Sequence, residues 1–131
     1  MSSEQPKPQS SKFMVWGGYV VSALPVFGLI MSAYMKLSNA PPLVEGFKKF
    51  GFPVSVAIPL GIVELVCTLL YVIPQTAVLG AILLTGYLGG AVATHVRVSD
   101  DFTAPIVMGV MIWLGLFLRD ARIRALVPWR R

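Results

Sequence analysis

Four long apolar stretches, separated by short polar segments, make up most of the chain. They cover residues 13–35, 54–73, 76–97 and 102–118. The first stretch carries no charged side chain, and the third carries none before Arg97. At a rise of about 1.5 Å per residue, about 20 apolar residues cross a bilayer core about 30 Å thick. The pattern therefore predicts an all-α protein, a bundle of four transmembrane helices, of which the fourth is the shortest.

The connection between the first two spans has an amphipathic pattern of its own. Within residues 36–52, large apolar side chains alternate with Glu45, Lys48 and Lys49. We expect a short helix lying at the membrane surface, and the alternative is a lid over a cavity between the helices. Spans two and three are joined only by Pro74 and Gln75, which predicts an antiparallel helical hairpin.

Both ends of the chain differ from the apolar middle. Residues 1–12 are polar and predict a disordered tail, and residues 13–118 form the membrane domain. Residues 119–131 carry five arginines and Trp129, which indicates a basic interfacial tail. An even number of crossings puts both termini on one side, together with seven of the eleven basic residues. Positively charged flanks stay in the cytosol, so we expect a bacterial inner-membrane protein with cytosolic termini.

Composition excludes several classes of protein. The chain of 131 residues is 56% hydrophobic and 13% charged, whereas soluble domains carry about 25% charged residues. The net charge of +5 fits basic membrane flanks and does not indicate nucleic-acid binding. A single cysteine, Cys67, and a single histidine, His95, cannot form an intrachain disulfide, a zinc cluster or a bis-histidine haem site. We therefore expect the bilayer as partner and no metal.

The third span is rich in small residues. Gly86 and Gly90 form a GxxxG pair, and such residues let helix backbones approach closely in lipid. They predict that this span is the most enclosed helix of the bundle. The alternative is a lipid-facing span whose glycines are incidental.

Glu64 is the candidate for intramembrane chemistry. It lies near the middle of the second span, where an ionisable group is costly and by default marks a functional site. Thr68 shares its helical face, and the antiparallel hairpin brings Tyr87 to a similar depth. Because neither span places a basic residue near Glu64, we expect a neutral carboxyl group hydrogen-bonded to Tyr87. It either handles a proton, a quinol or a lipid in a cavity, or holds the helices together.

His95 and Arg97 lie at the end of the third span, about 12 Å or more from Glu64 in depth. This separation excludes a Glu–His acid–base pair. Histidine is the side chain type that most often serves as a switch near neutral pH, so His95 and Arg97 are candidates for a surface gate. The alternative role is hydrogen bonding to the adjoining loop or to lipid headgroups.

Two of the spans carry a resemblance to a known family. The second span ends GIVELVCTLLYVIP and the third reads GAILLTGYLGGAVATHVR. With four spans in about 130 residues, the chain resembles the DoxX-like family of small membrane proteins. The resemblance implies a four-helix membrane bundle, and some relatives are associated with quinone-linked sulfur oxidation as small membrane subunits.

Three functions follow from these observations. The first is a small membrane subunit or anchor of a quinone-linked redox complex, with redox subunits as partners. The second is a quinol- or lipid-binding enzyme that uses Glu64, for which quinone is the candidate cofactor. The third is a proton-coupled transporter, which is disfavoured because the first span lacks a carboxylate. The sequence leaves open whether the chain is catalytic and what its oligomeric state is.

Overall fold

The structure, a computed structural model, describes residues 11–126. Its elements in chain order are α1 (Lys12–Ser38), α2 (Pro41–Phe50), the 3-10 turn η1 (Val54–Val56), α3 (Ala57–Val72), the 3-10 turn η2 (Pro74–Thr76), α4 (Ala77–Arg97), α5 (Thr103–Arg119) and α6 (Ala121–Leu126). Throughout this range the regular structure is helical, which confirms the all-α prediction. The predicted N-terminal tail and the Trp129 anchor lie outside the described residues, apart from Ser11 and Lys12.

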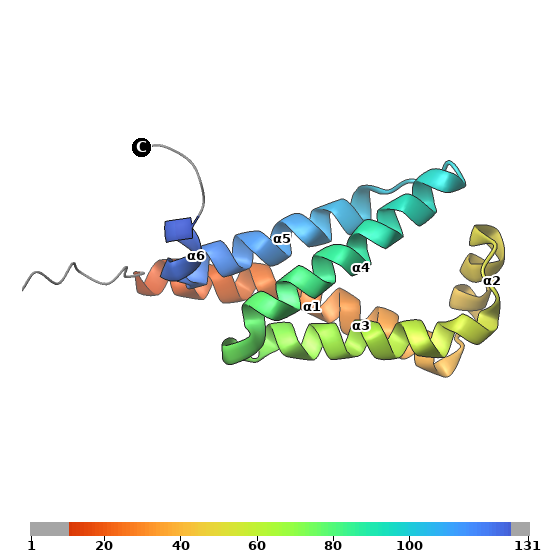
Figure 1. The fold of residues 1–131 in the computed structure, drawn as a ribbon, viewed down its shortest axis with the longest axis horizontal. Coiled ribbons are helices and arrows are strands. Elements are labelled where there is room, and N and C mark those ends of the chain that lie inside the picture. Colours follow the sequence, from red (N-terminus) through yellow and green to blue (C-terminus); the bar gives the residue numbers. More distant parts are fainter. Residues whose placement is uncertain (1–10, 127–131) are drawn as a thin grey trace, which may run out of the picture.

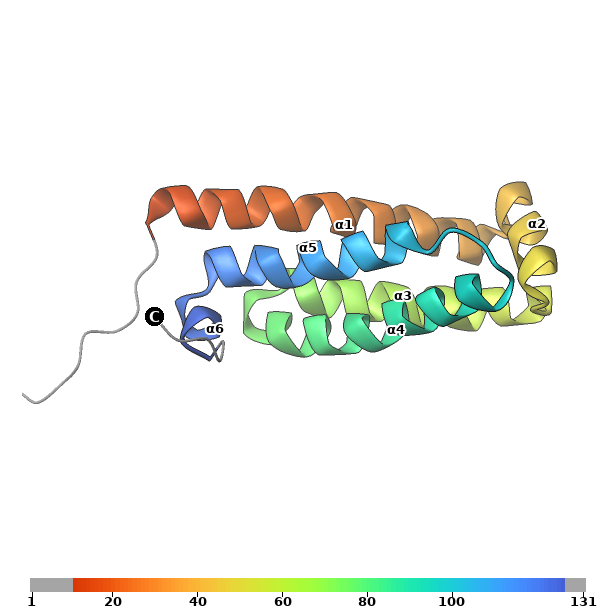
Figure 2. The same ribbon diagram turned by 90° about the horizontal axis from the view of Figure 1, so that it is seen from above.

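The long helices form a bundle in which neighbours run antiparallel (Figures 1 and 2). Helix α1 packs against α3 and α5, and α4 packs against the same two helices. Three segments are long and apolar enough to cross a membrane: Lys12–Ser38, Val54–Val72 and Pro74–Arg97. Helix α5 is apolar but has 17 residues and falls below that length. Three spans are therefore supported by length and composition, and the fourth crossing stays a prediction.

Helix α1 shows how the chain divides its surface between the bundle and the surroundings. Ser11 caps its first turn by accepting a hydrogen bond from the Met14 amide at 3.1 Å. The helix ends at Asn39, whose backbone is left-handed (φ 51°). Its buried residues recur every three or four positions and are Gly18, Ser22, Pro25, Leu29 and Ala33. The other faces expose large apolar side chains, including Phe13 at 91% and Trp16 at 73%. Such an apolar exterior fits a lipid environment.

The four long helices pack closely around Tyr71, toward the end of the bundle where α1 begins. Tyr71 of α3 is fully buried there and donates a hydrogen bond to the Ile112 carbonyl of α5 at 2.6 Å. Its hydroxyl also lies 3.0 Å from the Ser22 hydroxyl of α1. On α4, Gly80 lies directly against the Tyr71 backbone, with no room for a side chain. One tyrosine thus joins three helices, while a glycine lets the fourth approach.

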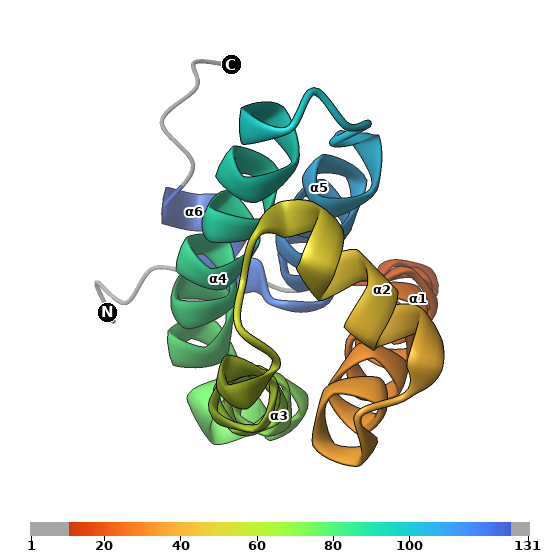
Figure 3. The same cartoon turned by 90° about the vertical axis from the view of Figure 1, so that its right-hand side faces the viewer.

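The other end of the bundle is open. Helices α3 and α4 diverge toward it, and α2 crosses the end of the bundle between them and α1 (Figures 1 and 3). A Cβ atom added at Gly86, Gly89 or Gly90 would meet no other atom within 4 Å. The prediction that Gly86 and Gly90 form the packed face of the most enclosed helix is therefore wrong for this chain. Close approach occurs about two to three turns earlier, at Gly80, because the two helices separate beyond that point.

Candidate functional site

A pocket of about 370 Å³ lies at the open end, between α2, α3 and α4. Phe47 and Phe50 of α2 and Phe52, which follows α2, form an aromatic wall. The opposite wall comes from α4, where Gly86 and Gly90 leave room. Gly86 and Gly90, which were expected to allow close helix packing, therefore leave space for the pocket.

A buried ion pair lies at the inner end of this pocket. The Lys36 Nζ is 3.1 Å from the Glu64 Oε1, and the two side chains are 13% and 2% exposed. Lys36, which lines the pocket, also donates a hydrogen bond to the Ser32 hydroxyl at 2.6 Å. The prediction that no basic residue lies near Glu64 is therefore wrong. Burying two opposite charges in contact offsets part of the cost of removing each from water.

Lys36 reaches Glu64 because α1 is longer than the sequence pattern indicated. The expected span ended at residue 35, whereas α1 continues to Ser38 and keeps Lys36 on its inner face. Gly61, one turn before Glu64, lets α1 come close: a side chain there would lie 3.0 Å from the Lys36 Cβ. The sequence held one indication of this contact, which is that Gly61 lies three residues before Glu64 and so on the same face of the helix. It shows that a neighbouring helix can approach, although not which helix it is.

Tyr87 lies beside this ion pair, as the depth argument predicted. Its hydroxyl and that of Ser32 are close enough to interact with the Glu64 carboxyl group. The Lys36 Nζ is also 5.8 Å from the centre of the Tyr87 ring. Lys36, Glu64, Tyr87 and Ser32 therefore form one polar cluster contributed by α1, α3 and α4.

Thr68 does not join that cluster. Its hydroxyl donates a hydrogen bond to the Glu64 backbone carbonyl at 2.7 Å, within α3, and its side chain is fully buried. The structure places Thr68 in a structural role next to the site.

His95 and Arg97 hold α2 against the end of α4. The His95 Nδ1 lies 2.7 Å from the Ala91 carbonyl oxygen, and its ring centre is 4.8 Å from that of Phe50. Arg97 donates a hydrogen bond to the Phe50 carbonyl, and its guanidinium carbon is 5.1 Å from the centre of the Phe52 ring. Both residues thus contact the aromatic wall of the pocket.

A second contact ties α2 to the loop after α4. The Lys49 Nζ lies 3.2 Å from a carboxylate oxygen of Asp100. The hydrogen bond from Lys49 lowers the pKa of the Asp100 carboxyl group below its ordinary value. The amphipathic segment is therefore a wall of the pocket, held in place from two sides, rather than only a surface helix.

The pocket can hold an organic ring but offers no metal site. In the described part of the chain, no three His, Cys, Asp or Glu side chains gather where they could bind a metal ion. Cys67 is buried in the core. The residues that the sequence interpretation missed are Lys36, Ser32 and the three phenylalanines, because each depends on how α1 and α2 pack on the hairpin.

Comparison with known proteins gives one result. The sequence model of the DoxX-like family matches residues 20–117. No curated protein and no solved structure matches the chain significantly. The match covers α3, α4 and most of α1 and α5, including every residue of the polar cluster.

Proposed function

The chain belongs to the DoxX-like family, and we propose that it is a multi-pass membrane protein that binds a quinone-class ligand in the pocket beside Glu64. The observation that carries this proposal is a buried Lys36–Glu64 pair at the inner end of an aromatic-walled pocket. Ionisable groups inside a membrane domain are costly and mark functional sites.

The chemistry of the pocket suits a quinone headgroup. A planar ring can stack on the phenylalanine side chains, and the ring carbonyls can accept hydrogen bonds from the Lys36 ammonium and the Tyr87 hydroxyl. A carboxylate such as that of Glu64 can accept a proton from the reduced ligand. The volume of about 370 Å³ lies within the range of small-molecule sites, about 300–1,000 Å³.

Within a cell, we propose that the chain acts as the small membrane subunit of a quinone-linked redox complex. The family resemblance supports this role, and the partner subunits would supply or accept the electrons. An enzyme that uses Glu64 for acid–base chemistry on a quinol or lipid is the alternative, and a proton-coupled transporter is a weaker one.

The experiment measures two quantities: the quinone that co-purifies with the protein, and the affinity of the protein for added quinone. The chain is extracted into lipid particles without detergent, and co-purifying quinone is quantified. A short-chain quinone is then titrated onto the parent, Glu64→Gln and Phe50→Leu while tryptophan fluorescence is followed. Glu45→Gln makes the same chemical change on the exposed face of α2 and is the matched control.

We expect the parent and Glu45→Gln to bind the quinone equally, and Glu64→Gln and Phe50→Leu to bind it about tenfold more weakly. Failure of the folded parent to bind any quinone would refute the proposal. Equal quinone binding by all four proteins would show that the quinone binds at a site other than the pocket beside Glu64. Substrate-driven proton movement across sealed vesicles that contain the protein, without quinone binding, would favour the transporter.

A further inference from the structure

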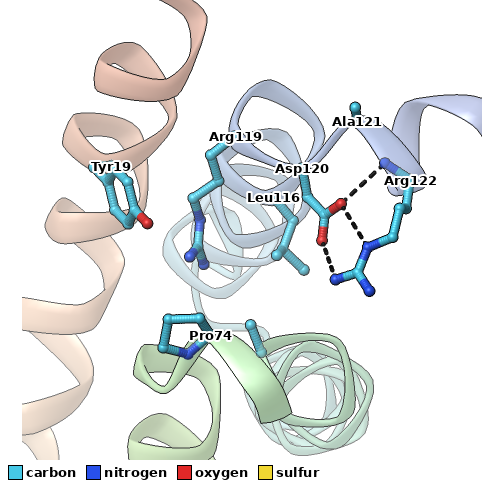
Figure 4. A pocket seen from close by; sticks show the side chains of 8 residues that line it. Tyr19, Pro74, Leu116, Arg119, Asp120, Ala121 and Arg122 are labelled. Atoms are coloured by element: carbon cyan, nitrogen blue, oxygen red, sulfur yellow. Dashed lines mark hydrogen bonds and ion pairs between the residues drawn. The ribbon is translucent and has the colours of Figure 1, made fainter. Parts of the chain in front are cut away.

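A second pocket, of about 400 Å³, lies at the opposite end of the bundle, near the start of α1 and the end of α5. Figure 4 shows Arg119 pointing into it between Tyr19 and Pro74, with Leu116 behind. It shares no residue with the pocket beside Glu64. A ligand in this pocket would therefore bind separately from a quinone beside Glu64.

Arg119 has an unusual environment. Its guanidinium carbon lies 5.2 Å from the ring centre of Tyr19 and 5.0 Å from that of Tyr71. The Nε atom is buried and finds no hydrogen-bond acceptor among residues 11–126. Across the same range, no carboxylate forms an ion pair with Arg119. The two aromatic faces stabilise the cation but do not neutralise it, so a partly buried positive charge lacks a counter-ion among residues 11–126.

The nearby carboxylate is already engaged. Asp120 accepts hydrogen bonds from the Arg122 Nε at 3.2 Å, from its Nη2 at 3.1 Å and from its amide at 2.9 Å (Figure 4). This arrangement leaves the charge of Arg119 uncancelled, so the lining of the pocket has a net charge of +1. A guanidinium matches a phosphate group, which can accept two parallel hydrogen bonds from it.

The position of the pocket favours a phosphate that is carried by a lipid. The pocket lies at the end of the bundle that also holds Lys12, Arg122 and Arg124, where headgroups and basic flanks meet. Pro74, Ala77 and Leu116 give it an apolar wall, and Tyr19, 52% exposed, continues that wall onto the outer face of α1. We propose that this pocket binds the headgroup phosphate of an anionic phospholipid, with Arg119 as the recognising residue.

The test is native mass spectrometry of delipidated protein in detergent, with phosphatidylglycerol or phosphatidylcholine added at equal concentrations. We expect phosphatidylglycerol to bind several-fold more tightly, and Arg119→Gln to weaken its binding about tenfold. Lys12→Gln removes the same charge at the same end outside the pocket and is the matched control. It should bind phosphatidylglycerol like the parent.

Three results would overturn the proposal. Equal affinity of the parent for the two lipids would remove the selectivity for an anionic headgroup. An equal loss of phosphatidylglycerol binding in Arg119→Gln and Lys12→Gln would indicate that the net charge of the protein alone attracts the lipid. Inorganic phosphate that binds as tightly as phosphatidylglycerol would identify the ligand as the free anion.

A second variant decides the question if Arg119→Gln fails to fold, as judged by circular dichroism. Arg122 is 79% exposed, so Arg122→Gln leaves the packing intact while freeing the Asp120 carboxylate to face the ligand. This variant should bind phosphatidylglycerol more weakly than the parent. Unchanged binding would overturn the proposal.

Discussion

At the scale of single residues, the Lys36–Glu64 pair is the feature with the largest energetic consequence. Glu64 is buried and Lys36 is largely buried, and each charge is tolerated because the other is 3.1 Å away. Removing one partner leaves the remaining charge without compensation, which in proteins costs about 3–5 kcal/mol. Replacing both partners by apolar side chains removes that penalty.

We therefore predict that Lys36→Met lowers the free energy of unfolding by about 3 kcal/mol, and that Lys36→Met combined with Glu64→Leu recovers most of the loss. Thermal unfolding in mild detergent measures both. Lys48→Met, which removes an exposed charge of α2, is the control and should melt like the parent. A double variant less stable than Lys36→Met would contradict this account.

The Lys36–Glu64 pair also shows which features of the site could be predicted from the sequence and which could not. The depth of Glu64 and its proximity to Tyr87 followed from helical rise and from the short connection at Pro74 and Gln75. The partner of Glu64 did not, because Lys36 lies 28 residues away on a helix whose rotation about its axis the sequence does not specify. Periodicity identifies the inner face of each helix but not which inner faces meet.

At the scale of elements, α4 has two halves with different roles. Its first half packs against α3, where Gly80 contacts the Tyr71 backbone, and its second half borders a pocket. Glycines occur in both halves, so their number in the sequence did not distinguish packing from open space. The helix positions were predictable from apolar length, whereas the divergence of α3 and α4 depends on all four helices.

A matched pair of substitutions tests this division of α4. Gly80→Ala places a Cβ against backbone atoms that cannot move aside, so we expect a loss of at least about 2 kcal/mol of stability. Gly86→Ala meets no neighbour and should be neutral or stabilise the helix by up to about 1 kcal/mol. Unfolding of both variants under identical conditions provides the comparison. A Gly86→Ala protein as unstable as Gly80→Ala would mean that this face is packed.

The attachment of α2 should depend on pH through Asp100. Lys49 lowers the pKa of the folded-state carboxyl group, so the contact contributes fully at pH values above the ordinary aspartate pKa, about 3.9. The contribution is lost as the pH falls through the lowered value. Asp100→Asn imitates the protonated state at neutral pH.

We predict that Asp100→Asn increases amide hydrogen exchange in residues 41–50 without changing that of α3. Asp101→Asn is the matched control, because Asp101 accepts hydrogen bonds from Thr103 and has no ion pair with α2 among the described contacts. Exchange followed by mass spectrometry gives the comparison. Equal protection of α2 in all three proteins would show that Arg97 and the aromatic contacts hold it alone.

At the scale of the whole molecule, the bundle has two unlike ends. The end near the start of α1 and the end of α5 carries Lys12, Arg119, Arg122 and Arg124, and the opposite end carries acidic residues beside its lysines. We predict that the first end faces the cytosol. A fluorescent protein fused to the C-terminus should be bright and a fused alkaline phosphatase inactive. A dark fluorescent fusion together with an active phosphatase fusion would show that the orientation is the reverse of the predicted one.

The unequal lengths of two neighbouring helices have a consequence for the surrounding lipid. Helix α1 has 27 residues and α5 has 17, so they measure about 40 Å and about 25 Å. A flat bilayer core about 30 Å thick matches neither. With α5 as the predicted fourth span packed beside α1, we expect the membrane to thin next to α5 and α1 to tilt. We therefore predict that the protein deforms the bilayer on one flank and concentrates in thinner membrane regions.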